Sequence, residues 1–265
     1  MKDTLIYLGE CKECSKETVK KINVERFITK LDSFFAHNDL QGATKHLFFW
    51  EKEARNLGDN LGLLTILNES IGFYRRTNDK EMALSALNEA LKIINDNGLN
   101  NSVGAATIYV NAATTLKSFG NAKDCIDYFT IAEEVYEKNG KKDYDYAALL
   151  NNKAAAFCDL KMYDEAKEYY FKAIEILNEE GKHDGDIAIT YVSLAQLVFS
   201  EDSSNVEKIE EYLDLSWEFL NSQRQVRDWS YAFVLTKCAP AFRFFKRKNE
   251  AKALEAVARE IYGRR

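Results

Sequence analysis

Residues of the types that carry out chemistry are few in this chain and lie far apart. Cys11 and Cys14 form a C-x-x-C pair, but a zinc ion in a structural site needs four ligands. The nearest histidines, His37 and His46, do not have the spacing of a zinc finger, and no parallel-sheet pattern surrounds the cysteines. We therefore expect neither a metal ion nor a cofactor, and we expect an ordinary lead-in segment over residues 1–22.

Motifs for catalysis are not found either. The sequence has no P-loop, no G-x-G-x-x-G, no H-E-x-x-H and no G-x-S-x-G. Carboxylate pairs such as Glu179–Glu180 are typical of solvated helix faces. His183 has no nucleophile nearby in the sequence and falls at an expected helix end, where a solvated surface position is the simpler interpretation. The sequence therefore predicts a protein that is not an enzyme.

Composition narrows the class of protein further. Of the 265 residues, 46% are hydrophobic and 29% are charged, as in folded rather than disordered chains. A net charge of −6 argues against general nucleic-acid binding. The N-terminal apolar run is too short for a signal peptide, and no apolar stretch long enough to span a membrane follows. Since five cysteines, an odd number, also fit a reducing compartment, we expect a cytoplasmic protein that binds neither nucleic acid nor membrane.

An internal repeat organises the chain. Small residues and rings recur with gaps of four and then three, as in Ala166, Tyr170 and Ala173. The first members of successive copies are 40, 42, 41, 43 and 42 residues apart. These first members are Ala43, Ala83, Cys125, Ala166, Ile209 and Ala251.

Residues that begin and end helices repeat with the same period. Four glycines, 40, 42 and 41 residues apart, each close an apolar-periodic run. Glycine adopts the left-handed conformation that ends a helix without a side-chain penalty. Asparagine and aspartate stand where helices should begin and would act as N-caps. The glycines are Gly58, Gly98, Gly140 and Gly181, and the expected caps are Asn60, Asp79, Asn121, Asn205 and Asn249.

Each copy of the repeat therefore predicts two antiparallel helices. One pair cannot bury its apolar stripe alone, so successive pairs must stack. We predict an all-α fold, an α–α superhelix of about six helix pairs, with a single repeat domain over residues 23–265. The expected repeats are 23–58, 60–98, 101–140, 144–181, 185–222 and 228–262. The first helices are expected at about 24–37, 61–76, 102–119, 144–160, 185–200 and 229–246, and the second at about 41–57, 80–96, 121–138, 163–180, 205–221 and 249–262.

The residue order within a copy resembles the tetratricopeptide repeat. Leu150 stands at the tryptophan site of that pattern, Ala154 at its glycine site and Phe157 at its tyrosine site. The resemblance covers residues 23–262. The period is longer than the usual 34 residues, and the closing proline is absent, so the chain is similar to the long-helix variety found in kinesin light chains and bacterial peptide-sensing regulators.

This resemblance implies binding through the concave surface that the first helices line. Four asparagines lie near the middle of expected first helices, although asparagine is a mediocre helix former. An amide both donates and accepts, which suits the main chain of a peptide, and asparagines at similar places do this in the long-repeat relatives. The alternative is that the amides tie adjacent helices together. The asparagines are Asn68, Asn111, Asn151 and Asn152.

Cations further along the same helices complete the expected site. Arg75 and Lys117 lie about two turns beyond the asparagines and are suited to a peptide carboxylate or to acidic side chains. The alternative is a solvated helix end that complements the helix dipole. Charge is also uneven: residues 163–218 carry a balance of −11 and residues 240–265 a balance of +5. This asymmetry suits a head-to-tail homodimer, a contact of the basic end with an acidic partner or, more simply, a solubilising terminal cap.

Three functions remain open. The first is a scaffold or adaptor that binds a protein or a linear peptide in its groove. The second is a sensor of small linear signalling peptides that acts through a separate effector chain, because only about 22 residues precede the first repeat. The third is an adaptor similar to the soluble attachment proteins of membrane fusion, for which no particular residue in the sequence argues.

Overall fold

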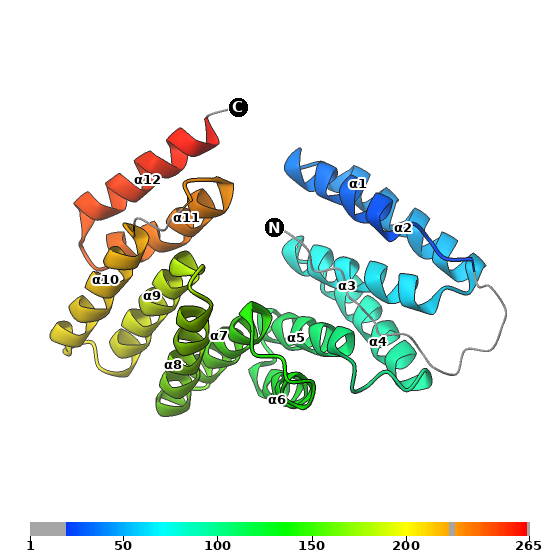
Figure 1. The fold of residues 1–265 in the computed structure, drawn as a ribbon, viewed down its shortest axis with the longest axis horizontal. Helices are drawn as coiled ribbons and strands as arrows, with labels where there is room; N and C mark the ends of the chain where they lie inside the picture. The colour runs from blue at the N-terminus through cyan, green and yellow to red at the C-terminus, as the bar shows by residue number, and fades with distance from the viewer. Residues whose placement is uncertain (1–19, 223–225, 264–265) are drawn as a thin grey trace. The chain divides into compact units, whose positions relative to one another are not determined.

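The described residues form helices and no strands. The structure is a computed structural model that describes residues 20–222 and 226–263, and within them lie twelve α-helices (Figure 1). The predicted all-α fold is confirmed. The helices are α1 (Val24–Ala36), α2 (Leu40–Leu57), α3 (Asn60–Arg76), α4 (Lys80–Asp96), α5 (Val103–Ser118), α6 (Ala122–Lys138), α7 (Tyr144–Asp159), α8 (Tyr163–Glu180), α9 (Asp184–Glu201), α10 (Val206–Leu220), α11 (Trp229–Phe244) and α12 (Lys248–Tyr262).

Each helix begins and ends within two residues of its expected position. The N-caps account for this agreement, because the side chains of Asp79, Asn121 and Asn205 each accept the backbone N–H three residues on, as predicted. Two expected caps are wrong. Asp59, not Asn60, caps α3, and α12 follows Arg247, which makes no side-chain cap bond.

Contacts divide the chain into two compact units, and the boundary falls between Asn139 and Gly140. The N-terminal unit contains α1–α6 and the C-terminal unit contains α7–α12 in the described residues. Inside each unit, the two helices of a pair pack together, as α3 does with α4 and α11 with α12, and first helices of neighbouring pairs also touch, as α3 does with α5 and α9 with α11. The first helices α3 and α5, and likewise α9 and α11, are therefore side by side.

The residues that define the repeat form the core of these pairs. The first member of every copy, from Ala43 to Ala251, is buried. Phe129 and Tyr170, which hold the middle place in their copies, are buried as well. Small first members let the two helices of a pair approach closely, and the larger middle members fill the space beside them. The regular spacing of these residues in the sequence therefore reflects their packing in the core.

The predicted helix-ending glycines have the expected backbone conformation. Gly58, Gly98, Gly140 and Gly181 have φ values of 66°, 63°, 66° and 69°. All four lie between the second helix of one pair and the first helix of the next. A left-handed residue at this point turns the chain toward the following pair.

A second series of left-handed residues lies inside the pairs and was not expected from the sequence. It occupies the short turn between the first and second helix, with φ values of 53°, 59°, 85°, 61° and 66°. Only one member is glycine, so the position is not marked by one residue type. The members are Asn38, Asn78, Gly120, Lys161 and Lys246.

The two lysines of this series provide a test of backbone strain. Lysine has no local hydrogen bond to offset the clash of its Cβ at positive φ, whereas glycine has no Cβ. We expect Lys161→Gly to raise the free energy of unfolding by up to about 1 kcal/mol, measured by urea denaturation. The matched change Gly181→Ala should lower it by about 1 kcal/mol. A loss of stability in Lys161→Gly would contradict this account.

Candidate functional site

An amide pair joins two first helices of the N-terminal unit. The Nδ2 of Asn111 on α5 donates to the Oδ1 of Asn68 on α3 at 2.6 Å. The Nδ2 of Asn68 in turn donates to the Oε1 of Glu69 at 3.3 Å. Asn68 is only 5% exposed, whereas Asn111 is half-buried. Asn68 therefore has the tying role that the sequence left as an alternative, and Asn111 is the member of the pair that solvent reaches.

Near the end of α3, a guanidinium group is held without a counter-ion. Arg75 donates a hydrogen bond to the hydroxyl of Thr114 on α5. Burial and the neighbouring Arg76 lower the pKa of Arg75. No carboxylate among the described residues forms an ion pair with it. A half-buried cation whose bonded partner is a neutral hydroxyl is suited to receive an anionic group.

The ring of Phe35 on α1 positions Arg76, the residue that follows Arg75. The Arg76 guanidinium carbon lies 4.2 Å from the centroid of the Phe35 ring, within the range of a cation–π contact. Phe35 also stacks on Phe73, with centroids 5.9 Å apart. The face formed by α1, α3 and α5 therefore holds two adjacent guanidinium groups by contacts from different helices.

The same face carries acidic groups. Burial is the main cause that raises the pKa of Glu69, and the nearby Asp32 on α1 raises it further. The hydrogen bond from Asn68 and the charge of Arg76 act in the opposite direction. Positive and negative groups are thus separated along α3 by about two turns.

In the C-terminal unit, the adjacent asparagines of α7 have different roles. The Oδ1 of Asn151 accepts a hydrogen bond from Thr190 on α9 at 3.1 Å, so Asn151 ties two first helices together. Asn152 is exposed, and its Nδ2 donates to the carbonyl of Ala148 in its own helix at 2.9 Å. Asn152 is the more exposed of the two.

The remaining predicted residue, Lys117, is half-buried in the last turn of α5, three residues after Thr114. The structure therefore links Asn68, Asn111 and Arg75 in the N-terminal unit, because Thr114, which accepts from Arg75, donates in turn to the backbone carbonyl of Asn111. Sequence reasoning missed Thr114, because a threonine within a helix is common, and its contact lies 39 residues from Arg75.

His183 differs from its expected solvated position. Its Nε2 lies 2.7 Å from Glu180, its Nδ1 lies 3.8 Å from Asp186, and its ring stacks on Tyr144 at 4.8 Å. The turn between α8 and α9 is so short that it brings both acidic groups to the imidazole. This histidine belongs to the packing between pairs.

Metal-binding clusters and membrane-spanning helices are both absent from the part of the chain that the structure describes. There, no group of three or more His, Cys, Asp or Glu side chains could hold a metal ion. None of the helices in those residues is both long and apolar enough to cross a membrane. Cys11 and Cys14 lie outside the described residues.

Comparison of the sequence with known protein families shows one match. Residues 54–232, about two thirds of the chain, match the family described as soluble NSF attachment protein, SNAP. The chain belongs to this family. The sequence pattern offered no particular residue for an adaptor of this kind, but the match places the chain there. No curated protein sequence matches it.

Solved structures show that the fold is that of tetratricopeptide-like repeats. The chain is similar to BtubC from P. vanneervenii, with 18% identity, 92% of each chain covered and a TM-score of 0.58. It is similar to the apo form of RapI, with 14% identity, 91% and 98% covered and a TM-score of 0.61. A Rap protein complexed with competence and sporulation factor has 15% identity, with 93% and 67% covered and a TM-score of 0.61. These identities support the fold alone.

The two classes of asparagine should separate in a stability measurement. We expect Asn68→Ala to lower the free energy of unfolding by about 1–3 kcal/mol, because it leaves the Nδ2 of Asn111 and the carboxylate of Glu69 without their partner. Asn152→Ala removes only a bond within one exposed turn and should change it by less than about 0.5 kcal/mol. Urea denaturation of both variants makes the comparison, and equal losses would contradict the assignment.

Proposed function

We propose that this chain is a non-enzymatic scaffold or adaptor that binds a protein or a linear peptide on the first-helix faces of its units. The observation that carries the proposal is Arg75, a half-buried guanidinium with only a neutral hydroxyl as its partner. An uncompensated cation is costly to maintain in a purely structural role. A ligand carboxylate would supply the missing partner through two parallel hydrogen bonds.

The neighbouring side chains suit a polypeptide ligand. In the N-terminal unit, Asn111 presents an amide that would pair with a peptide main chain, and Lys117 would extend the positive end of the site. In the C-terminal unit, Asn152 presents an amide of the same kind. Asn68 and Asn151 hold the first helices in register and take part indirectly. A negative net charge of −6 supports a polypeptide partner over nucleic acid. We place the protein in the cytoplasm on its cysteine content.

Family membership is consistent with this role. The family is described as one of attachment proteins, and a scaffold that holds another protein has a similar task. Whether the partner is a folded protein or a short peptide depends on the length of the surface it covers. Cross-linking followed by mass spectrometry would identify the partner and its contact residues together.

A second candidate is a sensor of small linear signalling peptides that acts through a separate effector chain. The similarity to the Rap protein complexed with competence and sporulation factor supports it. So does the similarity to the apo form of the quorum sensor NprR from B. thuringiensis. A sensor would bind a free peptide and then change its affinity for the effector, whereas a scaffold would show no such coupling.

The Arg75→Met variant tests the proposal. Removing a half-buried cation with a lowered pKa relieves a desolvation cost, so we expect the melting temperature to stay the same or rise. Affinity for the cross-linked partner, measured by calorimetry, should fall about tenfold or more, since a charge-assisted bond is lost. Arg259→Met, an exposed change on α12, is the charge-matched control and should leave affinity unaltered. Unchanged affinity in Arg75→Met would refute the proposed site.

A further inference from the structure

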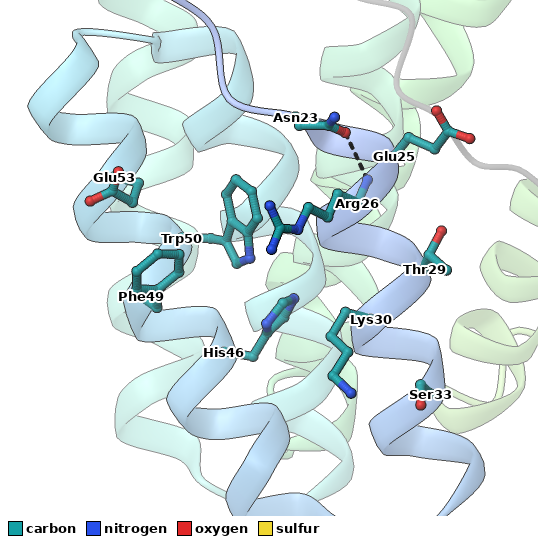
Figure 2. Close-up of a pocket in the computed structure, with 10 residues that line it drawn as sticks. All are labelled: Asn23, Glu25, Arg26, Thr29, Lys30, Ser33, His46, Phe49, Trp50 and Glu53. Carbon is teal, nitrogen blue, oxygen red and sulfur yellow. Dashed lines mark hydrogen bonds between the residues drawn. The ribbon is translucent and has the colours of Figure 1, made fainter.

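The N-terminal unit has an open crevice at its first helix pair. It lies between α1 and α2 and has a volume of about 850 Å³. Figure 2 shows Arg26 reaching from α1 to lie beside the ring of Trp50 on α2, with Lys30 one turn further along α1. Phe49 lines the α2 side of the crevice and is 57% exposed. This face is separate from the one that holds Arg75.

The repeat identifies the equivalent face of the next pair. The left-handed Asn38 and Asn78, like the N-caps Asp39 and Asp79, are 40 residues apart. The same shift relates the crevice residues of α1 and α2 to positions on α3 and α4. The equivalent residues are Arg26 and Ile66, Lys30 and Ser70, and Phe49 and Glu89.

In the second pair this face is covered by α2. Ile66 and Ser70 are fully buried. The hydroxyl of Ser70 donates to the Oε1 of Glu51 on α2 at 3.1 Å. Glu89 accepts a hydrogen bond from the Nη2 of Arg55 on α2 at 2.9 Å. This face of a helix pair is therefore a docking surface for a helix, which we call the seat. In the second pair, formed by α3 and α4, the helix α2 occupies it.

In the first pair, formed by α1 and α2, the equivalent positions hold residues of different types. Arg26 and Lys30 are exposed where the second pair has a buried isoleucine and a buried serine. Neither makes an ion pair with a described residue, although Lys30 lies 4.8 Å from the Phe34 ring centroid. Phe49 replaces the carboxylate of Glu89 and packs edge-on against Trp50 with centroids 5.7 Å apart.

We propose that this crevice binds an acidic amphipathic helix of a partner protein, which lies on α1 and α2 as α2 lies on α3 and α4. Carboxylates of that helix face Arg26 and Lys30, and an apolar side chain covers Phe49. Glu25 and Glu53 also line the crevice, but Figure 2 shows them away from Arg26 and Lys30, and these two cations, one turn apart on α1, favour an acidic side of the partner. The exposed ring sets its apolar position. The site goes beyond the first-helix faces and does not depend on them.

The probe for this site is a labelled synthetic peptide with the sequence of residues 40–57 and the changes Lys52→Glu and Arg55→Leu, which make it acidic. In the seat it would place its glutamate equivalent to Glu51 opposite Lys30, and its new leucine opposite Phe49. Fluorescence anisotropy with the full chain should show saturable binding. We expect Lys30→Glu to weaken binding about tenfold, because it replaces attraction by repulsion. A peptide that also carries Glu51→Lys should restore binding to the Lys30→Glu protein.

Control variants show whether peptide binding depends on this crevice. Lys45→Glu changes an exposed lysine of α2 that does not line the crevice and should leave peptide affinity unaltered. Arg75→Met should also leave it unaltered, so failure here and failure of the proposed first-helix site are distinguishable. Absence of saturable binding, or equal binding by Lys30→Glu without the swapped peptide, would overturn the proposal. Self-association that Lys30→Glu abolishes, seen by sedimentation, would assign the seat to a second copy and overturn it as well.

Discussion

The burial of one apolar face per helix pair against a neighbouring pair is the constraint on which the structure depends. A pair of 13- to 18-residue helices has too little interior to be stable alone. Stacking solves this only if each pair presents the same spacing to the next, which is why small residues such as Ala83 and Ala166 recur about every 41 residues and are fully buried. The turns must then return the chain at fixed points, and the left-handed residues do so.

The same stacking determines where polar groups can be used. A side chain between two first helices is removed from water and must find a partner there. Asn68 and Asn151 find one on the neighbouring first helix, at distances of 2.6 Å and 3.1 Å. On α7, the residue after Asn151 is Asn152, which is exposed. Adjacent positions of α7 therefore differ in role, since one ties two helices together and the next is accessible to a ligand.

Most of the fold could be predicted because its causes are local and periodic. Capping residues, glycines at positive φ and the spacing of core residues are all visible in the sequence, and they placed every helix within two residues. The lysines at positive φ could not be predicted, since Lys161 differs from any other exposed lysine only in the turn around it. The candidate site was predictable in residue type but not in role. Which amide ties helices, and whether Arg75 has a counter-ion, depends on partners about 40 residues away.

The amide pair of the N-terminal unit has a direction, and this direction reaches its surface. The carboxyl group of Glu69 accepts the hydrogen bond that the NH₂ group of Asn68 donates, so this NH₂ group is turned toward Glu69. The side-chain carbonyl of Asn68 then faces α5, where it accepts a hydrogen bond from the NH₂ group of Asn111. The amide oxygen of Asn111 consequently points away from the pair. The orientation set by Glu69 on α3 thus leaves the amide oxygen of Asn111 as an acceptor for a ligand. The complementary group of that ligand is an N–H donor.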